Sequence, residues 1–260
     1  MLMPSQITKY ILLITLVCPI FQANAETKEL KSKDLKASIA ILPGHSEAGI
    51  DGKLIGGFVE IAQAINGVYS AGNISIKLYP FARSLINVED GKADFHIPLI
   101  KSPYVPLETL TFTYATECIT QVSFVLYTRA DTSPLEHATL EQHKVVTIRG
   151  HKQLFPFNIS EVNNHQQGIN MLNTGRIDGF LVEQDVTDKY IRKHKFNNIR
   201  RTLYSVLDSC IVIPKDLRQK EIDNIISIAL RELKKSGELQ KISETIHQPF
   251  IEWQPYQMDW

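Results

Sequence analysis

The stretch RSLINVEDGKADFHIPLIK, residues 83–101, decides the fold, because its centre returns later as MLNTGRIDGFLVE, residues 171–183. In each copy an apolar pattern with helical spacing ends at a glycine. A glycine just past a helix adopts the left-handed cap conformation without a side-chain penalty. Three residues further on lies an aspartate, Asp94 or Asp178, followed by a short apolar run of strand type. The sequence therefore predicts two helix-to-strand units with the same turn.

The number of copies limits the architecture. A solenoid needs at least three stacked repeats, so two copies favour two similar α/β lobes instead. Chance is the alternative explanation, because Gly-x-x-Asp is a common pattern.

The first 25 residues have the pattern of a secretory signal peptide. Lys9 precedes an apolar segment, residues 10–17, that continues to residue 21, and Ala23-Asn24-Ala25 is a small-x-small cleavage site. The apolar core is too short to span a bilayer as a helix. Cys18 would suggest a lipid-anchored start, but Val17 stands before it where a small residue is needed. We therefore expect an exported, periplasmic protein.

Charge and length narrow the function classes. The chain has 28 basic and 28 acidic residues, and removal of residues 1–25, with Lys9 as their only charge, leaves a net charge of −1. A balanced charge does not attract nucleic acid or an anionic membrane. The remaining length fits one large domain or two lobes, and no low-complexity linker separates independent domains. No later segment has the length and hydropathy of a membrane span.

Strands and helices are expected to alternate along the mature chain. Strands are predicted at 37–42, 74–79, 122–127, 144–148, 198–204 and 210–213, and helices at 57–65, 186–193, 217–233 and up to residue 246. Asp51-Gly52-Lys53 predicts a hairpin turn. The tail, residues 249–260, holds both tryptophans and is expected to be a surface strap.

Five segments resemble extracellular family 3 of the periplasmic solute-binding proteins, the amino-acid type. They are residues 52–61, GKLIGGFVEI, for "dGkl-Gf-vDl"; 91–94, GKAD, for "G-k-v-D"; 111–113, TFT, for "dFS"; 144–150 for the second-lobe "gk-v-v-a-v"; and 214–246 for the closing helices. The segments occur in the family's order and cover nearly all of the mature chain.

This resemblance implies an α/β, two-lobed type 2 periplasmic binding protein fold with two crossover hinge strands, near residues 114–120 and 205–211. The first lobe would comprise residues 26–117 plus 211–260, and the second residues 118–210. Such proteins close on a ligand in the interlobe cleft by hinge bending. The implied function is capture of a small polar or anionic solute by a monomer, for an ABC-type transporter of the amino-acid-transport kind.

The resemblance also carries over three ligand positions. Phe81 falls where the family has an aromatic residue that packs on the ligand. Arg149 falls on a basic or polar position of the second lobe, where a strand ends before a helix start and anions are held. Glu183 matches the acid that receives a ligand ammonium group, and a solvated helix cap is the alternative for this residue.

One departure from the family concerns the carboxylate clamp. Amino-acid binders of the family carry an arginine a few residues before "dFS", which holds the α-carboxylate in a bidentate manner. This chain has Pro106 there, and no arginine lies between Arg83 and Arg129. Arg83, at a helix start, and Lys101, at the end of the repeat strand, are candidate replacements, although each could be an ordinary surface base.

Two ligand classes remain open. An acid would be held by Arg83 and Arg149 from opposite lobes, since a buried carboxylate is costly unless it is paired. A cation or a neutral amide would instead be held by Glu183 and Phe81. The sequence does not favour an ordinary amino acid held in the family's usual way.

Two cysteines, Cys118 and Cys210, remain in the mature chain. In an oxidising compartment such a pair is a candidate disulfide, and two free buried thiols are the alternative. The resemblance places one cysteine on each hinge strand. Antiparallel neighbours can meet the Cα separation of about 4.4 to 6.8 Å that a disulfide needs. We expect a disulfide that joins the hinge strands.

The sequence contains no motif for an enzyme, a metal or a cofactor. The eight histidines show no HExxH, HxH or Cys/His spacing, and neither Gly-x-Ser-x-Gly nor a phosphate loop is present. His96 and His151 could line the cleft, but a lone histidine is more often structural. Two alternatives to transport stay open. One is a sensory partner of a membrane receptor, and the other is a periplasmic dehydratase-like enzyme with Glu183 as acid and base.

Overall fold

The computed structural model describes residues 33–259, so the expected signal peptide lies outside the described residues, as does Trp260. The strands are β1 (Leu35–Ala40), β2 (Glu47–Ala48), β3 (Leu54–Ile55), β4 (Ile74–Tyr79), β5 (Phe95–Ile100), β6 (Phe112–Arg129), β7 (Val145–Ile148), β8 (Ser160–Val162), β9 (Gly179–Glu183) and β10 (Ile199–Pro214). The α-helices are α1 (Gly57–Val68), α2 (Phe81–Glu89), α3 (His165–Asn173), α4 (Gln184–His194), α5 (Gln219–Ser236) and α6 (Glu238–Ile246). Short 3-10 turns are η1 (Leu107–Thr109), η2 (His137–Gln142), η3 (Lys152–Leu154) and η4 (Pro255–Gln257).

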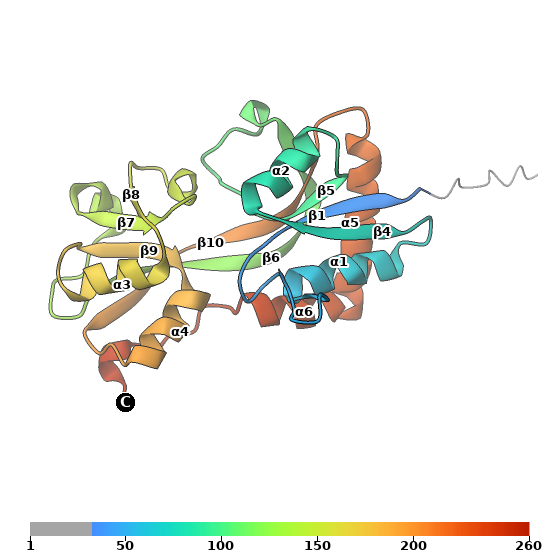
Figure 1. The fold of residues 1–260 in the computed structure, drawn as a ribbon. Coiled ribbons are helices and arrows are strands. Elements are labelled where there is room, and N and C mark those ends of the chain that lie inside the picture. Colours follow the sequence, from blue (N-terminus) through green and yellow to red (C-terminus); the bar gives the residue numbers. More distant parts are fainter. Residues whose placement is uncertain (1–32, 260) are drawn as a thin grey trace, which may run out of the picture. The chain divides into compact units, whose positions relative to one another are not determined.

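One eight-stranded sheet, in the order β4-β1-β5-β10-β6-β9-β7-β8, runs through both lobes. In the first lobe β4, β1 and β5 are parallel and β10 is antiparallel to β5. In the second lobe β8, β7 and β9 are parallel and β6 is antiparallel to β9. The long strands β6 and β10 pair with each other at the centre (Figure 1). This topology confirms the expected two-lobed α/β fold with two shared crossover strands.

The repeat seen in the sequence is also a structural repeat. The two turn glycines have φ angles of 68° and 69°. In the first copy the Asp94 amide donates to the Lys36 carbonyl at 2.9 Å, and Asp94 Oδ2 accepts from the Lys36 amide at 2.8 Å. Asp178 makes the same two bonds with Lys144, at 3.0 and 2.8 Å. Each aspartate therefore ties its turn to the start of the middle parallel strand of its lobe, β1 or β7.

Helices cover the sheet because each has an apolar face. In the first lobe α1, α5 and α6 pack on one face of the sheet and α2 on the other. In the second lobe α3 and α4 pack on one face, while the other is covered by residues of η2, η3 and their loops. The largest core cluster includes Phe58, Ile61, Ile65, Ile222, Ile226 and Leu230.

Three strand predictions differ from the structure. The strands predicted at 198–204 and 210–213 are one strand, β10, and the strand predicted at 122–127 extends back to residue 112 as β6. These two strands pair along their whole lengths, so their ladder continues through polar residues that interrupt the apolar pattern. The predicted hairpin turn joins β2 and β3, with Gly52 at φ 78°.

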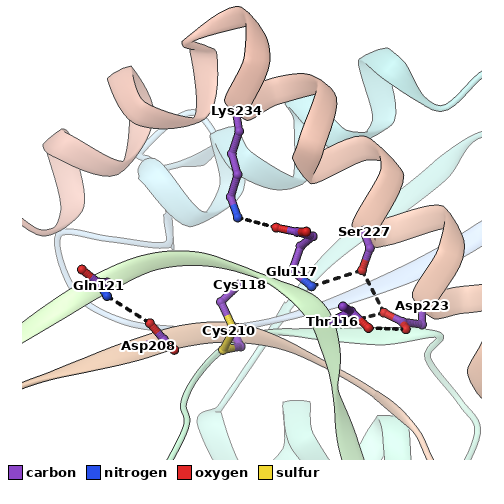
Figure 2. The surroundings of a disulfide bond; sticks show 9 residues. All are labelled: Thr116, Glu117, Cys118, Gln121, Asp208, Cys210, Asp223, Ser227 and Lys234. Atoms are coloured by element: carbon purple, nitrogen blue, oxygen red, sulfur yellow. Dashed lines mark hydrogen bonds and ion pairs between the residues drawn. A yellow bond between two sulfur atoms is a disulfide. The ribbon is translucent and has the colours of Figure 1, made fainter.

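A disulfide joins the two crossover strands. Cys118 of β6 and Cys210 of β10 are cross-strand partners and are bonded through sulfur (Figure 2). The register of the ladder shifts on both sides of Cys210, between residues 209 and 210 and between 210 and 212. The covalent link therefore lies where the hydrogen-bond ladder is interrupted.

The same part of β6 is also attached to helix α5 of the first lobe. Asp223 accepts from the amide and from the hydroxyl of Thr116, both at 2.7 Å. Lys234 lies 2.6 Å from the carboxylate of Glu117 (Figure 2). Residues 116–118 of β6 are thus held both by α5 and by the disulfide. The lobe boundaries predicted from the sequence stay a prediction.

Candidate functional site

The predicted ligand residues all lie at the C-terminal ends of parallel strands or shortly after them. Phe81 and Arg83 lie in the first turn of α2, directly after β4, and Lys101 follows β5. Arg149 follows β7, and Glu183 is the last residue of β9. In open α/β sheets, ligands bind in the crevice outside the carboxyl ends of the strands. The topology therefore places these residues on the strand ends where a ligand is expected.

The first-lobe residues have few partners. Phe81 is 41% exposed. Arg83 is exposed and has no hydrogen bond or ion pair within residues 33–259. Lys101 Nζ lies 5.7 Å from the centroid of the Tyr114 ring. These side chains are available to contact a ligand, and their role stays a prediction.

His96, which the sequence suggested for the cleft, is fully buried and structural instead. Its Nδ1 is 2.8 Å from the Ser84 hydroxyl, and its Nε2 is 3.0 Å from the Pro98 carbonyl oxygen. Because the carbonyl only accepts, Nε2 carries the proton and Nδ1 accepts from Ser84. Burial lowers the pKa of His96 to about 4. The ring also packs edge-on against Phe81, with centroids 5.6 Å apart.

The second lobe assembles a charged centre around Glu183. One carboxylate oxygen, Oε1, lies 3.2 Å from Nε2 of His165, and the other, Oε2, lies 3.2 Å from Nδ1 of His151. His151 follows β7, and His165 is the first residue of α3, three residues after the end of β8. Three neighbouring parallel strands therefore each bring one titratable side chain to a single point.

The protonation of this centre follows from its geometry. Burial acts to raise the pKa of Glu183, but the imidazoles of His151 and His165 outweigh burial and hold the pKa below its ordinary value. A bare Nδ1 beside a carboxylate oxygen would be repulsive, so His151 Nδ1 carries a proton. Although they are close, His151 Nδ1 and Glu183 Oε2 are not aligned as a hydrogen bond, and each is buried without a partner in the described chain. The centre therefore offers an unused donor beside an unused acceptor.

Helix α4 begins at the centre and contacts one of its histidines. Glu183 is the N-cap residue of α4, and Thr187 of the same helix lies 2.7 Å from His165 Nδ1 through its hydroxyl oxygen. His165 is thus held between two groups of the Glu183–α4 segment. A carboxylate flanked by two imidazoles can accept hydrogen bonds from a ligand or move a proton. Within residues 33–259 no group of three or more His, Cys, Asp or Glu residues is arranged to hold a metal ion.

The remaining predicted base, Arg149, lies at the edge of this centre. Its side chain is exposed, and Nη2 donates to the Asn163 side-chain oxygen at 2.9 Å. The described residues show no contact between Arg149 and Arg83. Their joint action on one ligand stays a prediction.

Sequence reasoning missed His165, His45, His247 and Asp185. His247 Nδ1 lies 2.8 Å from Asp185 Oδ2, and the His45 ring is 5.8 Å from the His247 ring. Burial and the nearby His247 lower the pKa of His45, against the opposing effect of Asp185. The repeat could have indicated His165. The offset between its two copies, from Asp94 to Asp178, is the same as the offset from Phe81 to His165. His165 therefore occupies the position of Phe81 in the second copy.

Comparison with known proteins identifies the fold. No family model and no curated protein matches the chain. Among solved structures, a histidine kinase sensor domain with similarity to periplasmic binding proteins matches with a TM-score of 0.63 and 18% identity over 84% of this chain and 99% of that chain. The probable amino-acid ABC transporter extracellular-binding protein ytmK from Bacillus subtilis matches at 0.60 and 18%, over 82% and 97%.

A third match is an ancestral amino acid-binding protein described as a precursor of cyclohexadienyl dehydratase. Its TM-score is 0.59, with 15% identity over 83% of this chain and 95% of that chain. Within residues 33–259, no helix has the length and apolar character needed to cross a membrane. Likeness at such low identity concerns the fold alone. Together with the shared strands β6 and β10, it shows that this chain has the two-lobed type 2 fold of the periplasmic binding proteins.

Proposed function

We propose that this protein is an exported, periplasmic solute-binding protein that captures a small polar or anionic solute between its lobes. Its partner would be the permease of an ABC-type transporter. The observation that carries the proposal is the Glu183 centre, because it places unpaired polar atoms at the carboxyl ends of β7 and β9 on a fold with two crossover strands. The likeness to an amino-acid ABC transporter binding protein supports the same conclusion.

The geometry also indicates how a solute would be held. Glu183 Oε2 would accept a hydrogen bond from the solute, and His151 Nδ1 would donate a hydrogen bond to the solute. Phe81, exposed on the first lobe, would pack on an apolar part of the solute. Arg149 or Arg83 would pair with an anionic group, since a charged hydrogen bond compensates the cost of burying a carboxylate.

A ligand screen tests the proposal. The mature protein, residues 26–260, is heated with amino acids, organic acids, amines and small peptides, and stabilising compounds are titrated by calorimetry. We expect at least one hit whose affinity falls tenfold or more in Glu183→Gln. Lys193→Ala, an exposed base on the far end of α4, is the control and should bind normally. The absence of any hit, or hits that bind Glu183→Gln with unchanged affinity, would contradict the proposal.

The two arginines separate the ligand classes. If the solute is an acid held between the lobes, Arg83→Ala and Arg149→Ala should each lose about 2 to 5 kcal/mol of binding free energy, the cost of removing one partner of a buried charged pair. Unchanged affinity in both variants would exclude the acid and leave a cation or a neutral amide held by Glu183 and Phe81.

Catalysis is a second candidate function, favoured by one feature of the site. A carboxylate between two imidazoles is suited to general acid–base chemistry, and the fold is shared with the precursor of a dehydratase. Hits from the screen are therefore incubated with the protein and followed by mass spectrometry. Turnover that disappears in Glu183→Gln would establish an enzyme, while recovery of every hit unchanged would exclude it for those compounds.

A further inference from the structure

The C-terminal residues connect the two lobes. Residues 248–257, here called the strap, follow α6 of the first lobe and lie on the second. Phe250 and Trp253 pack against the core of the second lobe, and Pro255 is buried. The strap has little regular structure of its own, so specific side-chain bonds must hold it in place.

Arg201 of β10 is the main anchor of the strap. Its fully buried guanidinium donates from Nε and Nη2 to the Asp188 carboxylate at 2.9 and 2.7 Å. Nη1 donates to the backbone carbonyls of Ile251 and Trp253 at 3.2 and 2.9 Å. The Arg201 backbone exchanges two further bonds with the Gln254 side chain, at 2.9 and 2.8 Å. One buried cation thus binds helix α4 and the strap at the same time.

Trp253 provides a second attachment to α4. The guanidinium carbon of Arg192, on α4, lies 3.8 Å from the Trp253 ring centroid, and that of Arg201 lies 4.4 Å from it. Such contacts contribute about 0.5 to 2 kcal/mol each, and more when they are desolvated. The indole is therefore held by α4 and by β10 together.

The strap contacts the beginning of α4, next to the Glu183 centre. The Gln184 side chain donates to the Gln248 carbonyl at 2.7 Å, and Asp185 accepts from the Gln248 amide at 3.2 Å. Glu183 immediately precedes Gln184 in the chain, and Thr187 on the same helix contacts His165. The strap and the Glu183 centre therefore meet through a single helix.

A pocket borders the side of α4 that faces the strap. This solvent-open pocket, of about 240 Å³, lies between α4, α6 and the strap. Its lining includes Gln184, Asp188 and Arg192 of α4, Thr245 of α6, and Pro249 and Trp253 of the strap. The bonds at the edge of this pocket join α4 to the strap where side chains do not fill the space between them.

We infer that Arg201 and Trp253 are positioning residues that act through the strap and α4 to hold Glu183 in place beside His151 and His165. Neither residue needs to touch the solute. Arg201 is fully buried under the strap, and Trp253 contacts Arg192 near the C-terminal end of α4. The inference rests on the proposed function of the Glu183 centre, but it concerns the protein without ligand.

The test measures Glu183 directly in the ligand-free protein. The side-chain carboxyl carbon of Glu183 is followed by NMR during a pH titration, and hydrogen exchange is measured for residues 184–194. In Trp253→Ala we expect the Glu183 midpoint to rise toward the ordinary glutamate value, because the carboxylate moves away from His151 and His165. Amide exchange in α4 should accelerate tenfold or more. Trp253→Phe, which retains an aromatic face, should restore most of both values.

Matched variants keep the test decisive. Met258→Ala changes a partly exposed residue just beyond the strap and should behave as the wild type. If Trp253→Ala does not fold, Arg192→Ala removes one of the two guanidinium contacts from an exposed position and should produce a smaller shift in the same direction. A Glu183 midpoint that stays at the wild-type value in the folded variants would overturn the inference. A protein that binds no solute would count against the proposed function and leave these ligand-free results intact.

Discussion

At the scale of single residues, the two lobes use the same positions for different chemistry. Phe81 at the start of α2 packs on His96 of β5, and the equivalent pair in the second lobe is His165 at the start of α3 and Phe180 of β9. The ring centroids are 5.6 and 6.4 Å apart. The imidazole therefore lies on a buried strand in the first lobe, whereas in the second lobe it lies at the helix start, where it faces Glu183.

A neighbouring position adapts to this exchange. Ser84 of α2 bonds to His96, and its counterpart Gly168 of α3 lies against Phe180. A Cβ atom on Gly168 would lie 2.5 Å from the phenyl ring, so no larger residue fits there without displacing the ring. The first lobe thus satisfies a buried imidazole with a hydroxyl, and the second makes room for a phenyl ring with a glycine.

Buried His96 should make stability depend on pH. Its pKa is about 4 in the folded protein, because burial disfavours the imidazolium, against 6.5 in the unfolded chain. Between these values the unfolded chain binds the extra proton, so the free energy of unfolding should fall by about 3 kcal/mol as the pH falls from 6.5 to 4, and the full contribution is present above pH 6.5. Urea unfolding across this range should show a smaller pH dependence in His96→Gln. Exposed His194→Gln is the control, and equal slopes in the two variants would refute the prediction.

At the scale of elements, the helix-to-strand unit depends on its aspartate. Asp178→Ala would remove the bond that the carboxylate accepts from the Lys144 amide, which should cost about 0.5 to 1.5 kcal/mol because water can reach this exposed amide. Asp94→Ala should cost more, because Asp94 also pairs with Arg218 at 2.7 Å. Asp90→Ala is the control in urea unfolding, because Asp90 lies in the turn of the first repeat copy but is exposed. Losses no larger than that of the control would show that the shared bonds are not needed for stability.

The disulfide should be the largest single covalent contribution to stability. It closes a loop with a sequence separation of 92, which corresponds to about 4 to 5 kcal/mol in the chain-entropy model. The double variant Cys118→Ser/Cys210→Ser should therefore unfold at a lower urea concentration than the oxidised wild type. Reductant should destabilise the wild type and leave the double variant unchanged. Free thiols detected by mass after alkylation without reductant would contradict the bond itself.

At the scale of the whole molecule, we expect the two lobes to move relative to each other by bending of the two shared strands, β6 and β10. Residues 116–118 of β6 are fixed to α5 and to β10, so we expect bending to occur on either side of this anchored segment. Hits from the ligand screen should reduce the radius of gyration measured by small-angle scattering. The Glu183→Gln variant with the same compounds is the control and should keep the ligand-free value. One unchanged shape with every hit would argue against hinge closure.

The sequence alone determined the parts of the fold that depend on neighbouring residues. A glycine with positive φ, an aspartate three residues later and an apolar strand form one local unit, so both copies and their common turn could be predicted. The helix at 217–233 and the strand at 122–127 were predicted for the same reason, from residue patterns within one segment. The pairing of Cys118 with Cys210 followed from the resemblance, which placed both residues on crossover strands.

Only the tertiary structure decided what surrounds Glu183. The sequence predicted an acid that is free to receive a ligand ammonium group, but His151 and His165 join it because β7, β8 and β9 are parallel neighbours. The sequence likewise showed Arg201 only as one base on a predicted strand. In the structure its guanidinium is buried, where a charge is costly unless it is paired, and its partners lie on α4 and on the strap. These groups come together through sheet order and burial, which are properties of distant segments and leave no periodic pattern in the chain.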